Sequence, residues 1–178
     1  MRILFFALFA MVGLGTASAQ SDDAGLLDRA VSAAVRTLDA ALPQLDPLPF
    51  GVDTIAYRAA LTQKRFQSAQ WGAPVDLVLE IRPEASGSCS RFAAFVVMPP
   101  KTGKIPLVLC PKFFTQGADA LRELTILHEM VHVVAGPDEC RAMAFAARVE
   151  QAAKGKFTRV DAYWRANDCP ASGFSLPD

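Results

Sequence analysis

The chain has no excess of either charge. Its 18 lysines and arginines balance 18 aspartates and glutamates, so the formal net charge is 0 at neutral pH. Loss of the first 19 residues, which contain Arg2 and no acidic residue, would change this value to about −1. A surface that binds nucleic acid or an anionic membrane needs a clear excess of lysine and arginine. The composition therefore predicts neither partner.

Long apolar runs are also missing, apart from one at the beginning of the chain. Arg2 is followed by an apolar segment over residues 3–14 and then by the small residues Ala17-Ser18-Ala19. This order is typical of an export signal, and the apolar segment is too short for a transmembrane helix. We therefore predict a signal peptide at residues 1–19 and a single domain at residues 20–178, without a membrane anchor after cleavage. The expected location is periplasmic or secreted.

Cysteine occurs only four times, and no two cysteines have C-x-x-C spacing. This absence argues against a thiolate zinc site and against a dithiol redox motif. An even number of cysteines in an oxidising compartment favours two disulfides. Of the three connectivities, we favour Cys89–Cys110 with Cys140–Cys169, because each bond closes a local loop. Free buried thiols are the alternative.

Alternating and β-branched patterns predict a small sheet in the middle of the chain. Apolar and acidic residues alternate over residues 75–81, which is the period of a half-buried strand. Residues 91–98 and 105–109 are rich in aromatic and β-branched side chains, and residues 99–104 between them have the composition of a turn. A β-hairpin is therefore expected there, within a short and mostly antiparallel sheet.

Helices are predicted before and after this sheet. Apolar residues at helical spacing over residues 23–42 predict an amphipathic N-terminal helix, and Asp53 can cap a second helix. A third helix is expected over residues 118–135, because Gly136 can adopt the left-handed conformation that ends a helix. Pro137 suits the first position of a following helix. The predicted fold class is therefore α+β.

Both histidines of the chain lie in one pentapeptide, His128-Glu129-Met130-Val131-His132. Residues four apart share a face of a helix, so both imidazoles can bind one metal ion. Glu129 occupies the position where a zinc hydrolase has its general base. The flanking residues are mostly apolar and predict a buried helix, in which two imidazoles without a partner would be costly. The pattern therefore predicts a Zn²⁺ site rather than a pair of core histidines.

The third ligand is predicted from the next turn of the chain. A catalytic zinc site takes three protein ligands and a water. If the chain reverses at Gly136, then Glu139 returns to the level of His132 and is the favoured ligand. Asp138 is an alternative, although it is better placed to cap the second helix. Glu150 is a further alternative, but it lies about three helical turns, roughly 16 Å, farther along.

Hydrolysis at a zinc site also needs a donor near the developing oxyanion. Tyr163 is the favoured candidate, and Arg141 and Tyr57 are alternatives. For two of them the structural interpretation is the stronger one: Tyr163 next to Trp164 is more often part of a core aromatic pair, and Arg141 is more often a charge on the helix surface.

The segment Thr125–Ala146 resembles the core of the zincin metallopeptidases, and most closely that of the gluzincins. In those enzymes a helix with the HExxH motif precedes a helix with a Glu-x-x-Ala pattern, which is matched here by Glu139-Cys140-Arg141-Ala142. The chain has neither the third histidine of metzincins nor the Gly-Thr-x-x-Asp sequence of aspzincins. The resemblance covers about 25 residues, so it is a match of motifs rather than of the whole chain.

The resemblance implies a zinc metallopeptidase that acts on peptides or proteins, with Glu129 as general base and His128, His132 and Glu139 as metal ligands. It also implies a sheet before the active-site helix and places the strand over residues 105–109 at the edge that holds substrate. Two alternatives stay open. One is a zincin-like domain in which zinc joins two helices without catalysis, and the other is an exported α+β domain that binds no metal.

Overall fold

The computed structural model describes residues 16–115, 117 and 119–178. Most of the export signal predicted at residues 1–19 lies outside the described residues. Its last four residues belong to the first helix, α1 (Thr16–Ala41), which therefore runs through the predicted cleavage site. Within the described part of the chain, no helix combines the length and the apolar character that a membrane crossing requires.

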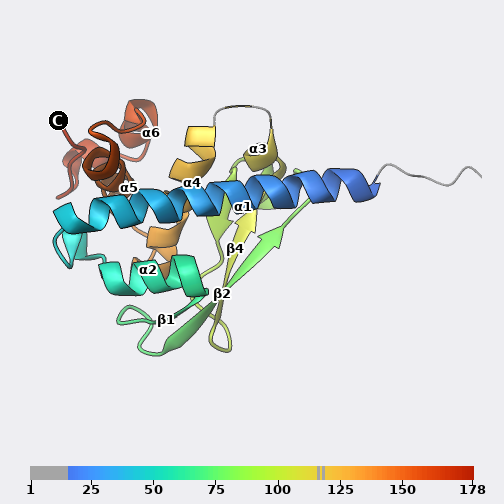
Figure 1. The fold of residues 1–178 in the computed structure, drawn as a ribbon, viewed down its shortest axis with the longest axis horizontal. Helices are drawn as coiled ribbons and strands as arrows, with labels where there is room; N and C mark the ends of the chain where they lie inside the picture. Colours follow the sequence, from blue (N-terminus) through green and yellow to red (C-terminus); the bar gives the residue numbers. More distant parts are fainter. Residues whose placement is uncertain (1–15, 116, 118) are drawn as a thin grey trace, which may run out of the picture.

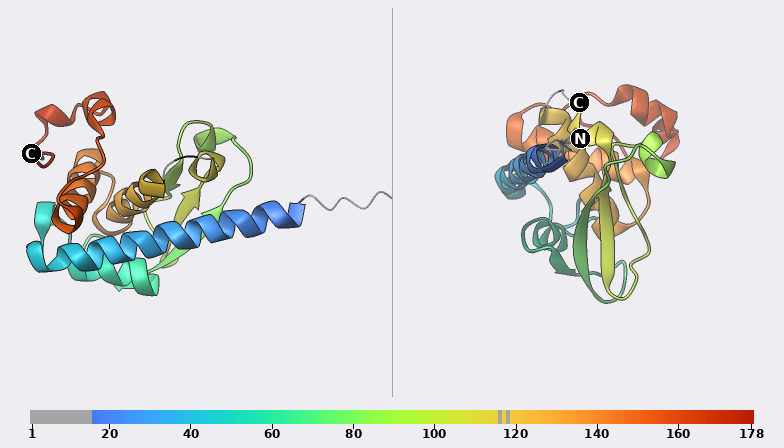
Figure 2. Two further views of the ribbon diagram at one scale, coloured as in Figure 1. Left: turned by 45° about the horizontal axis from the view of Figure 1, so that its top comes forward. Right: turned by 90° about the vertical axis from the view of Figure 1, so that its right-hand side faces the viewer.

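The fold is α+β, as predicted from the sequence. Helix α1 runs along the whole length of the molecule (Figure 1). The sheet lies below the middle of this helix in that view, and the C-terminal helix α6 (Asp161–Ala166) lies above its C-terminal end. Helix α1 packs against α4 (Asp119–Ala135) and α5 (Glu139–Lys154), which form an antiparallel pair. The end-on view in Figure 2 shows the sheet beneath these helices. The smaller helices are α2 (Thr54–Gln63), α3 (Pro111–Phe114) and α6, with 3-10 turns η1 (Leu42–Gln44), η2 (Pro49–Gly51), η3 (Gly87–Ser90) and η4 (Cys169–Ala171).

The sheet has four strands in the order β1-β2-β4-β3. They are β1 (Arg65–Gln67), β2 (Pro74–Ile81), β3 (Ala94–Val96) and β4 (Lys104–Leu109). The predicted hairpin is confirmed, because β3 and β4 are antiparallel with Phe95 opposite Val108. Strands β1 and β2 are also antiparallel, whereas β2 and β4 form a longer parallel pair. The sheet is therefore mixed, with antiparallel pairs in the majority.

The placement of residues 105–109 at the edge of the sheet was wrong. Strand β4 lies between β2 and β3, and its residues Leu107, Val108 and Leu109 are completely buried. A strand that is buried on both faces reads as a continuous apolar run, which is the pattern of an interior strand. The edge of the sheet on this side is instead β3, which packs against α4.

Two disulfides close in the predicted pairing. Cys89–Cys110 joins η3 to the residue after β4, and Cys140–Cys169 joins the first turn of α5 to η4. Both bonds lie in small buried clusters outside the main core, Cys89–Cys110 beside Val108 and Cys140–Cys169 beside Met143 and Trp164. They therefore fix the irregular segments that surround α4 and α5.

The turn between α4 and α5 differs slightly from its prediction. Gly136 has a φ of 91° and donates its N–H to the carbonyl oxygen of His132, which ends α4 as expected. Pro137 was expected at the first helical position of the next helix. The side chain of Asp138 instead accepts the N–H of Arg141, so Asp138 is the N-cap and α5 begins at Glu139.

Candidate metal centre

Three predicted ligands converge where α4 meets the beginning of α5. The Nε2 atoms of His128 and His132 lie 3.1 Å apart. One carboxylate oxygen of Glu139, Oε2, lies 3.1 Å from His128 Nε2 and 3.5 Å from His132 Nε2. The two helices are held in this arrangement by the reversal at Gly136, which brings the first turn of α5 beside the last turns of α4.

These distances fit a tetrahedral zinc site. A zinc ion at 2.0–2.1 Å from its ligands keeps neighbouring ligand atoms about 3.3–3.4 Å apart in a regular tetrahedron. The three observed separations fall on both sides of this value. Two imidazoles and one carboxylate are also a donor set that zinc accepts in catalytic sites, where the fourth position belongs to water or substrate. The residues present therefore suit zinc in both chemistry and spacing.

The orientation of His132 is fixed by a hydrogen bond on its far side. Its Nδ1–H donates to the carbonyl oxygen of Gly136 at 2.9 Å. A carbonyl oxygen only accepts, so the proton of the neutral ring lies on Nδ1 and the Nε2 lone pair faces the cluster. A partner of this kind is usual behind a histidine that binds a metal, because it sets both the tautomer and the ring orientation.

The cluster also favours ionisation of its carboxylate. Burial opposes the charged form of Glu139, but hydrogen bonds with His128 and His132 outweigh it, and the pKa of Glu139 lies well below its usual value. Burial likewise opposes the charged form of His132, yet the hydrogen bond with Glu139 and the nearby Glu129 raise the pKa of that ring. These bonds need an N–H on Nε2 of each ring, so a divalent cation that binds here would have to displace those protons before the two imidazoles and the anionic carboxylate could bind it.

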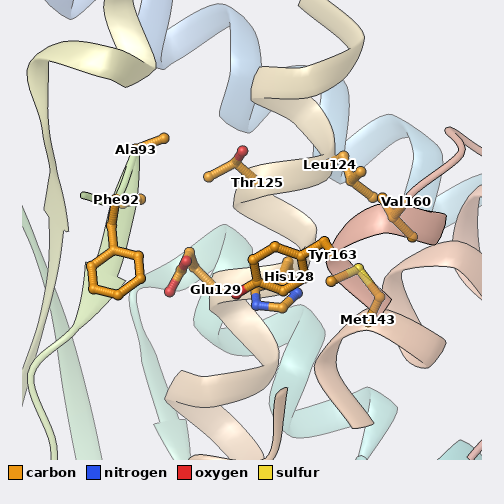
Figure 3. A pocket seen from close by; sticks show the side chains of 10 residues that line it. Phe92, Ala93, Leu124, Thr125, His128, Glu129, Met143, Val160 and Tyr163 are labelled. Atoms are coloured by element: carbon orange, nitrogen blue, oxygen red, sulfur yellow. The ribbon is translucent and has the colours of Figure 1, made fainter. Parts of the chain in front are cut away.

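Glu129 stands apart from these three residues, as a general base should. It lines a pocket of about 220 Å³ together with His128, and its carboxylate lies between His128 and Phe92 in Figure 3. The side chain is only 8 % exposed. Burial raises the pKa of Glu129 above its usual value, which makes its carboxylate a better proton acceptor.

Tyr163 reaches the centre from α6. Its hydroxyl donates to Glu139 Oε2 at 3.0 Å, and its ring meets the His128 ring edge to face at 6.1 Å. Burial and the neighbouring Glu139 raise the pKa of this phenol, so it stays a donor at neutral pH. Tyr163 and Trp164 do not form the core pair considered from the sequence, because Trp164 is buried whereas Tyr163 is 41 % exposed.

The two alternative donors lie elsewhere. The Tyr57 hydroxyl is buried and donates to the carbonyl oxygen of Leu127, on the core side of α4. Arg141 donates to the carbonyl oxygen of Ala135 at 3.0 Å and so supports the end of α4. Of the three donors considered from the sequence, Tyr163 alone contacts the candidate ligands in the described structure.

The two alternative ligands have other partners. Asp138 caps α5 through the N–H of Arg141. Glu150 is 1 % exposed and binds the N–H of Thr158 at 2.8 Å and the ammonium group of Lys154 at 3.2 Å. Lys154 also pairs with Glu123 of α4 at 2.7 Å, which forms a second polar cluster away from the histidines.

Sequence reasoning missed this second cluster and the walls of the pocket. The spacing of Glu150 and Lys154, four residues apart in one helix, was a usable signal for an ion pair. The pocket walls gave no local signal. They come from the segment before β3, from α5 and from the segment around α6. Figure 3 shows Phe92 and Tyr163 on either side of Glu129, with Met143 and Val160 beyond His128.

Replacing Glu139 by alanine is expected to lower the affinity for zinc by more than about 100-fold, because loss of an outer-shell partner alone costs roughly 10–100-fold. Asp138→Ala is the matched control. It removes the same charge one residue earlier and should cost about 1 kcal/mol of stability through the lost cap, with a much smaller change in zinc affinity. Competition with a chromophoric chelator measures both affinities. Equal losses in the two variants would remove Glu139 from the ligand set.

The chain was compared with protein-family models, with curated proteins and with solved structures, and none of the three comparisons found a match.

Proposed function

We propose that this chain is an exported zinc metallopeptidase that hydrolyses peptide bonds of peptide or protein substrates. The observation that supports this most is the convergence of His128, His132 and Glu139 at tetrahedral spacing, with the buried carboxylate of Glu129 beside an open pocket. Two disulfides agree with an oxidising compartment, and we propose a periplasmic or secreted location.

In this proposal His128, His132 and Glu139 hold the zinc. The bound ion would supply a Lewis acid and would lower the pKa of a water towards about 7. Glu129 takes a proton from the attacking water and passes it to the amide nitrogen of the leaving group. Its raised pKa serves both steps, since a desolvated carboxylate accepts a proton more readily and can then release it to a stronger base.

The hydroxyl of Tyr163 is the candidate donor to the developing oxyanion. It already lies 3.0 Å from the ligand oxygen of Glu139, so it stands at the rim of the proposed zinc site. A small movement of α6 would turn this O–H towards a substrate carbonyl that lies over the three ligands. The donor would then contribute most in the transition state, where negative charge accumulates on that oxygen.

Tyr163→Phe is expected to lower kcat by about 10²–10³-fold, the usual effect of losing one oxyanion donor. Zinc should stay bound, because the phenol is not in the ligand set. Tyr57→Phe is the matched control, since the chain has only two tyrosines and Tyr57 donates to a core carbonyl instead. That variant should lose about 1 kcal/mol of stability and keep its kcat. Equal kcat values for wild type and Tyr163→Phe would exclude the catalytic role of Tyr163.

The proposal as a whole is tested by incubating the purified, zinc-loaded chain with a diverse mixture of peptides and identifying the products by mass spectrometry. Cleavage should occur and should stop when zinc is removed by a chelator. An absence of products with zinc bound would contradict the enzymatic function and would favour the zinc-binding domain without catalysis.

A further inference from the structure

The pocket beside the candidate metal centre follows from the helical period. Leu124 lies one turn before His128 on α4, and Met143 lies one turn after Glu139 on α5. Because the chain reverses at Gly136, these two turns face each other, and both side chains line the pocket of about 220 Å³. The pocket therefore continues directly from the proposed zinc ligands along the two helices.

The lining of this pocket is apolar on three sides. Leu124 and Met143 form the buried part, Phe92, Ala93 and Ala94 form one wall, and Val160 forms the other with the ring of Tyr163. The polar groups are those of Thr125, His128 and Glu129, and the Tyr163 hydroxyl is directed at Glu139. None of the described lining residues is lysine or arginine.

The mouth of the pocket exposes two aromatic rings. Phe92 is 42 % exposed and Tyr163 is 41 % exposed, and Figure 3 shows them on opposite sides of the Glu129 carboxylate. Large apolar side chains on a surface are informative when they gather at one site, because there they mark a binding surface. Here both rings border the pocket that contains the candidate general base.

A second pocket, of about 160 Å³, lies on the other side of Glu129. It shares Phe92, Ala94, Glu129 and Tyr163 with the first pocket. Its remaining lining extends along the edge strand β3, to Pro137 at the α4–α5 turn, and to the candidate ligands His132 and Glu139. It again contains no lysine or arginine among the described residues. The candidate base therefore lies in the middle of a cleft rather than at a closed end.

We infer that this cleft accepts the interior of an extended peptide chain, with an uncharged apolar side chain next to the cleaved bond seated in the pocket between Leu124 and Met143. The inference rests on the proposed function and deepens it to an endopeptidase with apolar specificity. A chain that passes Glu129 fills space on both sides of it. An enzyme that requires a free carboxyl terminus would need a cation in the cleft, and neither pocket presents a lysine or arginine.

The first test makes two comparisons. One uses a single peptide with either free or blocked termini, and the other uses variants of that peptide with leucine, aspartate or lysine at each position that flanks the cleaved bond. Peptides with acetylated and amidated ends should be cleaved as fast as free ones. Exchanging leucine for aspartate or lysine at one flanking position should lower kcat/KM about 100-fold, since the charge would be buried without a partner. A requirement for a free terminus, or equal rates for all three residues, would overturn the inference.

The second test changes the pocket itself. Thr125→Lys places a cation in the pocket lining, one turn before Glu129, and should reverse the preference from leucine to aspartate. Leu121→Lys is the matched control, because Leu121 is one turn earlier on α4, is 55 % exposed and lies outside the described pocket lining. The control should keep the leucine preference. The same change of preference in both variants, or in neither, would contradict the assigned pocket.

Binding separates this inference from the proposed function. In the Glu129→Gln variant, fluorescence anisotropy with the blocked leucine and aspartate peptides measures affinity without cleavage. Tighter binding of the leucine peptide supports the apolar pocket, whether or not the wild-type protein hydrolyses any peptide. An absence of hydrolysis together with this binding preference would refute only the enzymatic function. Hydrolysis without a difference between the two peptides would leave the function standing and refute the pocket.

Discussion

Glu129→Gln is expected to lower kcat for peptide hydrolysis by about 10²–10⁴-fold, which is the usual contribution of a general base. The amide is close in size to the carboxylate, so the helix and the three candidate ligands should stay in place. The variant should therefore bind one zinc ion as wild type does. Initial rates on a blocked peptide, together with the metal content of the same samples, measure both properties.

Glu123→Gln is the matched control for this experiment. Glu123 is on the same helix and is 8 % exposed, as Glu129 is, but its carboxylate pairs with Lys154 and Thr37 and does not line the pocket of Glu129. Its amide variant should unfold at a lower temperature, because Lys154 loses a charged partner, and its folded fraction should keep the wild-type kcat. If Glu129→Gln hydrolyses peptides as fast as wild type, Glu129 is not the base.

Replacing His128 by alanine should abolish stoichiometric zinc binding. Two of the three proposed ligands are the only histidines of the chain, so no other imidazole can compensate. A ligand that binds only the folded state stabilises it by about 2.7 kcal/mol at a concentration 100 times its Kd. Zinc should therefore raise the unfolding temperature of wild type and leave that of His128→Ala unchanged.

His132→Ala should behave in the same way, whereas Met130→Leu, a change of similar volume on the buried part of α4, should keep its response to zinc. Differential scanning fluorimetry with and without zinc compares the four proteins. An equal increase in unfolding temperature for wild type and both histidine variants would place the zinc elsewhere on the chain.

The parts of the site that were predictable depend on local periodicity. His128 and His132 share a helix face because they are four residues apart, and Glu139 follows the reversal at Gly136 by only a few residues. Both relations are set by helical geometry and by the left-handed conformation that glycine permits. Other local signals predicted α1 from its apolar periodicity, α2 from its Asp53 cap, the β3–β4 hairpin from its turn composition, and both disulfides from the even number of cysteines and the short loops they close.

The parts that were not predictable depend on pairing between distant segments. Strand β4 pairs in parallel with β2, although more than 20 residues separate the two strands in the sequence. The sequence of neither strand predicts which other strand it pairs with. Tyr163 contacts Glu139 although the two are 24 residues apart in the sequence. The segment that carries Tyr163 is held against α5 by the hydrogen bond of Thr158 to Glu150 and by the Cys140–Cys169 disulfide. Its hydroxyl was a candidate by chemistry, but only the tertiary structure brings it to the ligands.

If two imidazoles and one carboxylate of this chain hold a zinc ion, X-ray absorption at the zinc edge of the purified, zinc-loaded protein will record them as neighbours of the metal. We expect one zinc ion per chain, with only nitrogen and oxygen neighbours at about 2.0–2.2 Å and the outer-shell signature of two imidazole rings. A protein that retains no zinc, or a spectrum with fewer than two imidazoles, would contradict this expectation.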